Sequence, residues 1–169
     1  MAMTREVILG RLVEHFPSDH PPEEVISILG REVKHDGAEE IEGLLRGQKW
    51  IDLQHQAVNL QASNLITLTV EAFVYYLPAF LRSALSDPEE EAATYALYAL
   101  VPTSHLDVYY ESTVKLFLPE QAGVIADTLE YLQEDESFAF LEEEFPPAIA
   151  LWRMREKEEL SATENVDIE

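Results

Sequence analysis

The chain has 169 residues and a formal net charge of −22, because 33 Asp and Glu residues face only 11 Lys and Arg residues. Its apolar fraction of 47% is that of a globular chain, and its length suffices for one domain with its own core. The charge argues against nucleic acid or anionic lipid as partners, and the absence of cysteine excludes disulfides and thiolate metal sites.

Apolar residues recur at helical spacing along nearly the whole chain, which predicts an all-α fold. Capping residues, prolines and acids divide this pattern into short helices with short connections. The predicted helices cover residues 5–16, 21–30, 38–46, 53–63, 70–85, 88–101, 104–117, 119–132, 137–145 and 147–154. Such a series is typical of a multi-helix bundle whose neighbouring helices pack antiparallel.

The amino-terminal half carries several boundary signals. Thr4 is expected to cap the first helix, and Asp52 the helix over 53–63. Residues 31–37 end in Asp-Gly and are interpreted as a loop, with a short strand or a turn left open as alternatives.

The helix over residues 70–85 has the clearest pattern, with Thr69 before it as a cap. Its apolar stripe consists of Val70, Phe73, Val74, Leu77, Phe80, Leu81, Ala84 and Leu85. Pro78 lies inside this helix and cannot donate to the Val74 carbonyl, so we expect a proline-kinked central helix, at a cost of roughly 3 kcal/mol if uncompensated. Pro78 and Tyr75 are expected on the side opposite the stripe.

In the carboxyl-terminal half, Asp87 and the proline after it are expected to start a helix that contains the acids at 89–91. We interpret residues 1–160 as a single helical domain and residues 161–169 as a flexible acidic tail.

No membrane association is expected. The longest apolar run, Val74 to Leu81, contains a proline and is far shorter than the about 20 residues that span a bilayer. The first sixteen residues include Glu6 and Glu14 and lack an apolar signal core. We therefore expect a cytoplasmic protein.

Four short motifs occur in a fixed order between residues 40 and 133. They are Trp50-Ile51-Asp52-Leu53, Thr69-Val70-Glu71-Ala72-Phe73 with the following Val74-Tyr75-Tyr76-Leu77-Pro78-Ala79, Pro119-Glu120-Gln121, and Leu129-Glu130-Tyr131-Leu132. Together they resemble an uncharacterised family of bacterial proteins, with Val70 standing where similar proteins carry proline. The resemblance implies a bacterial origin and one domain, and it supplies no mechanism.

The negative charge is distributed unevenly. Between Ser83 and Trp152, fifteen acids face a single base, Lys115, so this segment holds −14 of the −22. Within it, nine acids form three runs of three, which we call the acidic clusters. They are Glu89, Glu90 and Glu91; Glu134, Asp135 and Glu136; and Glu142, Glu143 and Glu144. The last cluster is expected at the end of the helix over 137–145, where its charge opposes the helix dipole.

Two interpretations of the acidic clusters stand side by side. Charge runs are most often a solvated surface without a partner. Fifteen acids against one base also favour a docking face for a cationic protein, because such a partner would relieve their mutual repulsion. Aromatic side chains would then anchor the complex, and the candidates are Tyr95, Tyr98, Tyr109 and Tyr110.

Signals for catalysis are weak. Glu32-x-x-His35 and Asp52-x-x-His55 each place a carboxylate and an imidazole three residues apart, but neither pair lies on an apolar helix face, where a buried metal site would need it. No glycine-rich phosphate loop or nucleophile motif is present in the sequence. We therefore assign no catalytic residue, metal or cofactor.

The sequence favours an acidic all-α binding protein that docks on a basic protein, with a bacterial immunity or inhibitor protein against a toxin or nuclease as the leading hypothesis. Two alternatives are a metal-dependent enzyme with carboxylate and histidine ligands, and a scaffold that associates with itself. The oligomeric state, the partner and the convergence of the acidic clusters in space are not determined by the sequence.

Overall fold

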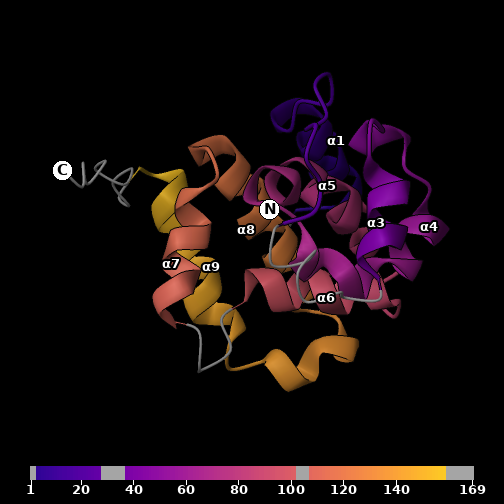
Figure 1. The fold of residues 1–169 in the computed structure, drawn as a ribbon. Helices are drawn as coiled ribbons and strands as arrows, with labels where there is room; N and C mark the ends of the chain where they lie inside the picture. The colour runs from indigo at the N-terminus through magenta and orange to yellow at the C-terminus, as the bar shows by residue number, and fades with distance from the viewer. Residues whose placement is uncertain (1–2, 28–36, 102–106, 159–169) are drawn as a thin grey trace.

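Helices make up almost all of the regular structure in the computed structural model, which describes residues 3–27, 37–101 and 107–158, without the side chains of 107–110 (Figure 1). The α-helices are α1 (Arg5–His15), α3 (Ala38–Leu45), α4 (His55–Leu60), α5 (Val70–Ser86), α6 (Glu91–Leu100), α7 (Asp107–Lys115), α8 (Pro119–Leu132) and α9 (Phe145–Glu156). The 3-10 helices are η1 (Trp50–Asp52), η2 (Ala62–Thr67) and η3 (Glu136–Leu141). The predicted all-α fold is confirmed.

Helix α5 occupies the middle of the bundle and contacts α1, α4, α6, α8 and η1. Thr69 caps it as predicted, since its Oγ1 accepts a hydrogen bond of 3.1 Å from the Ala72 amide. The expected one-sided stripe is wrong at the amino end and in the middle of the helix. Val70 at the amino end is exposed, while Tyr76 and Pro78 in the middle are buried with the stripe, because several neighbouring helices pack against α5.

Residues 17–27 do not form the predicted helix in the part that the structure describes. Ile26 instead makes an antiparallel bridge with Leu68, and the Thr69 amide donates to the Val25 carbonyl at 2.9 Å. The apolar, β-branched Val25 and Ile26 are buried in this extended segment, so tertiary packing outweighs the helix start signal of the two preceding prolines.

Asp52 does not cap a helix over 53–63. It ends η1, and α4 begins only at His55, after Gln54 in an extended conformation and without a side-chain cap. The chain then forms η2 rather than continuing α4. The predicted single helix is thus replaced by α4 and the start of η2.

Helix α6 begins at Glu91. Glu89 and Glu90 therefore precede the helix, and the prediction that they lie in its first turn is wrong. Its amino-terminal cap comes from another helix. The Asn59 Oδ1 of α4 accepts from the Ala92 amide at 2.9 Å, while Asn59 Nδ2 donates to Glu90 Oε2 at 2.6 Å. A residue 33 positions away therefore satisfies the free amide end of α6.

A buried carboxylate joins three helices. Asp127 of α8 has 2% of its area exposed and pairs with Arg11 of α1 and with Arg153 of α9, the latter at 2.7 Å. Arg153 also contacts Glu130 at 2.9 Å and Glu156 at 2.8 Å. These ion pairs hold α1 and α9 against α8.

Helix α9 begins at Phe145, two residues earlier than predicted, and Glu144 is its amino-terminal cap residue. The cluster Glu142–Glu144 follows the carboxyl end of the short helix η3, as predicted, and it also precedes the positive end of α9, where acids are favourable. The predicted loop at 31–37, except Gly37, the start of the helix at 104 and the tail at 161–169 lie outside the described residues.

Candidate docking surface

The three acidic clusters lack local neutralisation. Six of the nine residues are exposed and the other three, Glu90, Asp135 and Glu144, are partly buried. Within the described part of the chain, no Lys, Arg or His side chain forms an ion pair with any of the nine. Most of their charge is therefore turned towards solvent.

Two of the clusters flank one short segment. Helix η3 begins at Glu136 and ends at Leu141, so the cluster 134–136 precedes its body and the cluster 142–144 follows it. Six residues of 3-10 helix rise about 12 Å at most, which keeps the two clusters near one another. The cluster 89–91 is instead placed at the start of α6.

An aromatic ridge connects α6 with η3, and we define it as Tyr95, Tyr98 and Phe140. The rings of Tyr95 and Tyr98 are 6.3 Å apart between centroids, and those of Tyr98 and Phe140 are 6.4 Å apart. Tyr98 is 48% exposed and Phe140 56% exposed. Two of the four predicted anchors thus lie on this ridge; the side chains of the other two, Tyr109 and Tyr110, are outside the described residues.

Beside the ridge lies an apolar groove of about 300 Å³, whose lining includes Ile66, Val70, Phe73, Tyr95, Tyr98 and Leu116. Ile66 is 76% exposed, although it is apolar. No charged side chain is among the described residues that line the groove. Sequence reasoning did not identify this groove, because its residues come from η2, α5, α6 and α7 and share no local motif.

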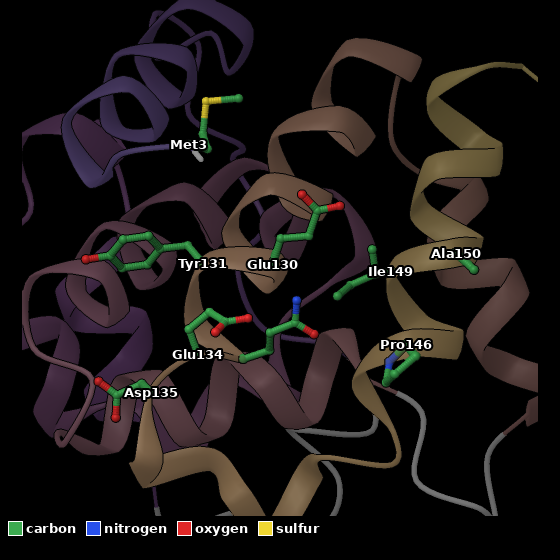
Figure 2. A pocket seen from close by; sticks show the side chains of 9 residues that line it. Met3, Glu130, Tyr131, Glu134, Asp135, Pro146, Ile149 and Ala150 are labelled. Atoms are coloured by element: carbon green, nitrogen blue, oxygen red, sulfur yellow. The ribbon is translucent and has the colours of Figure 1, made fainter. Parts of the chain in front are cut away.

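A second depression, the acidic groove, lies between the end of α8 and the start of α9 and has a volume of about 940 Å³ (Figure 2). Its lining includes Glu130, Glu134, Asp135, Pro146, Ile149 and Ala150. Figure 2 shows the acids on the side of α8 and Pro146, Ile149 and Ala150 on the side of α9. Two of the predicted docking residues, Glu134 and Asp135, therefore line a concave surface.

The charge in the acidic groove is only partly balanced. Glu130 pairs with Arg153, whereas Glu134 has no cation beside it among the described residues. Burial by itself would lower the pKa of Arg153, but the hydrogen bonds and the negative charges of Glu130 and Glu156 together outweigh burial and raise it, so this arginine remains charged. Asp135 accepts a hydrogen bond of 2.9 Å from the Ser137 amide and thereby caps η3.

The histidine pairs considered in the sequence do not assemble a metal site where they are described. Among the described residues, no group of three or more His, Asp and Glu side chains is arranged to hold a metal ion. His55 opens α4 and Asp52 lies in η1, while Glu32 and His35 are outside the described residues. No described helix has the length and apolarity needed to cross a membrane.

Comparison with known proteins identifies the protein family of the chain. The model of a family of unknown function, DUF6714, matches residues 31–156. No curated protein and no solved structure matches the chain. The matched residues extend beyond both ends of the segment 40–133, whose motifs resemble an uncharacterised family. Helix α1 lies before the first matched residue.

Proposed function

The chain belongs to DUF6714, a family of unknown function, and we propose that it is a cytoplasmic binding protein that docks on a basic protein through the acidic clusters. The observation that carries the proposal is that nine acids in three runs have no ion-pair partner among the described residues. We infer further that the partner is a toxin or nuclease and that binding inhibits it.

Repulsion among these acids provides a driving force. The acids within a cluster are adjacent in sequence, so their like charges interact over distances comparable with the screening length of about 8 Å at physiological salt. A Lys or Arg brought in by a partner replaces this repulsion with attraction, which increases the association rate more than the final affinity.

Affinity requires apolar contacts as well as charge. The aromatic ridge offers Tyr98 and Phe140, which are half-exposed rings next to the apolar groove. Aromatic side chains that become buried on binding contribute most of the energy of many interfaces. The acidic cluster at 134–136 lies on the same short segment as Phe140, so charge and apolar surface are adjacent there.

A toxin or nuclease is the favoured partner because proteins that act on nucleic acid carry clustered Lys and Arg to contact phosphates. An acidic protein that covers such a surface blocks the nucleic acid. The formal charge of −22 gives this chain the sign needed to compete with a phosphate backbone.

Titration with an oligolysine peptide tests the electrostatic part of the proposal. Binding should weaken steeply between about 0.05 and about 0.2 M salt, because exposed charges are screened. The variant with Glu134, Glu136, Glu142 and Glu143 changed to Gln should bind less tightly and with a smaller salt dependence. Its matched control changes Glu23, Glu24, Glu39 and Glu40, which are equally exposed acids elsewhere.

Equal losses in the two fourfold variants would show that only overall charge matters, and the proposed docking surface would be wrong. Binding that does not depend on salt would contradict an electrostatic partner altogether.

A further inference from the structure

We propose that the acidic groove seats an amphipathic basic helix of the partner protein, with apolar residues on one side of that helix and Lys or Arg on the other. This inference rests on the proposed function, since it assigns a place and a shape to the basic partner. Its basis is the chemical difference between the two walls of the groove.

The wall formed by α9 is apolar. Pro146 and Ala150 are exposed there, and Ile149 is half-buried between them and the core. Figure 2 shows all three residues on α9, with the Ile149 side chain pointing towards Glu130. An apolar side chain of a partner would lose contact with water by packing against this wall, which is favourable in proportion to the buried area.

The wall formed by the end of α8 carries the acids of the groove, beside Tyr131 and Gln133. Glu134 and Asp135 follow the last residue of α8, and the last turn of that helix contains no basic residue. Free carbonyl groups give the end of a helix a partial negative charge, so acids there are unfavourable by about 0.3–1 kcal/mol each. A cation in the groove would meet both the carboxylates and the helix end.

The spacing of exposed residues on the α9 wall matches the spacing along one face of a helix. Along α9, Pro146 and Ala150 are four residues apart, which corresponds to about 6 Å of helix. Two side chains at positions i and i+4 of a partner helix have about the same separation. The volume of about 940 Å³ exceeds the space needed by one side chain, and it is open at the surface. Two apolar side chains one turn apart on a partner helix would therefore lie at the spacing of Pro146 and Ala150.

The apolar groove beside the aromatic ridge is the less suitable seat for this partner. The described residues that line it include no carboxylate, so it offers apolar contact without charge complementarity. The acidic groove combines both properties within the same cavity. We therefore assign the basic helix to the acidic groove.

Two synthetic peptides of identical composition test the inference. Both contain only Leu and Lys; in the first, the leucines recur at i, i+4 and i+7, and in the second they are distributed around the helix. Isothermal titration calorimetry at low salt should show that the first peptide binds about tenfold more tightly, because only it presents an apolar face to α9.

Variant Ala150→Lys places a long cationic side chain at an exposed position of the apolar wall and should weaken binding of the first peptide about tenfold. Gln56→Lys, at an exposed position of α4, adds the same charge elsewhere and should change binding less than twofold. Circular dichroism confirms that both variants remain folded. Amide chemical shifts should change most at residues 130–135 and 148–150 when the first peptide is added.

The outcomes separate the inference from the proposed function. If both peptides bind equally tightly, and Ala150→Lys weakens binding no more than Gln56→Lys does, the assignment to the acidic groove is wrong. The proposal of a basic partner would still stand. Shift changes centred on α6 and η2 likewise overturn it in favour of the apolar groove. If neither peptide binds at low salt, the proposed function fails as well.

Discussion

The buried carboxylate of Asp127 offers the sharpest test of how the acidic groove is held together. Asp127→Asn removes one charge while nearly preserving the shape of the side chain. In the wild type, Asp127 is 2% exposed and pairs with Arg11 and Arg153. Breaking a buried ion pair from one side costs about 3–5 kcal/mol, because the remaining charge stays in a poorly solvated place.

The lower end of this range applies here. Arg153 keeps its contacts with Glu130 at 2.9 Å and Glu156 at 2.8 Å after the change. Arg11 loses its partner on α8, but its side chain is partly exposed and retains access to water. We therefore expect the free energy of unfolding to fall by about 3 kcal/mol and the melting temperature by about 6–12 °C for a domain of this size.

Urea unfolding measured by tryptophan fluorescence reports the effect directly, because Trp50 and Trp152 are both buried. Glu130→Gln is the matched control, since Glu130 contacts the same arginine from a partly exposed position and should cost less than about 1 kcal/mol. A loss for Asp127→Asn no larger than that of the control would refute the idea that this ion pair joins α1 and α9 to α8.

Three further predictions follow from individual contacts. Asn59→Ala should lower the free energy of unfolding by about 1 kcal/mol in urea titrations, because it removes the cap of α6, whereas Gln56→Ala should have almost no effect. Burial raises the pKa of Tyr76 to about 12, so the buried neutral hydroxyl contributes its full stability below about pH 10. The wild type should therefore lose up to about 3 kcal/mol of stability between pH 10 and 12, and Tyr76→Phe should not show this loss. Light scattering should show no self-association at low salt, since like charges repel, and a dimer there would favour the scaffold alternative.

The sequence was most informative where one helix contains its own boundary signals. Thr69 predicted the cap of α5, and the apolar pattern predicted its length within one residue. The exposed side of α5 could not be predicted, because the position of Pro78 inside the core depends on which helices surround it. Periodicity indicates that a helix has an apolar side, but not that a second side is also covered.

Contacts between distant residues were beyond local patterns. Asn59 caps a helix that begins 32 residues later, and Asp127 was one acid among fifteen in the acidic segment. In the structure, its burial and its ion pairs with Arg11 and Arg153 set this acid apart from the exposed ones. Its place amid the apolar residues of α8, between Ala126 and Leu129, was the one sequence signal of burial.

The sequence named some of the residues that form the candidate docking surface. The sequence identified the acids of the clusters and two rings of the aromatic ridge, Tyr95 and Tyr98. It did not identify Phe140 or the apolar wall of the acidic groove, because Pro146, Ile149 and Ala150 belong to a helix whose neighbour across the groove is set by packing. Concavity arises from the relative placement of helices, which no short motif encodes.

The salt dependence of oligolysine binding, compared between the two fourfold variants, tests the central claim most directly. Both variants remove four exposed acids, so they differ only in whether the acids belong to the clusters around η3 or to residues 23–24 and 39–40. The account predicts a smaller salt slope for the cluster variant and a nearly unchanged slope for the other. Identical slopes would show that the clusters are solvated surface and have no special part in binding.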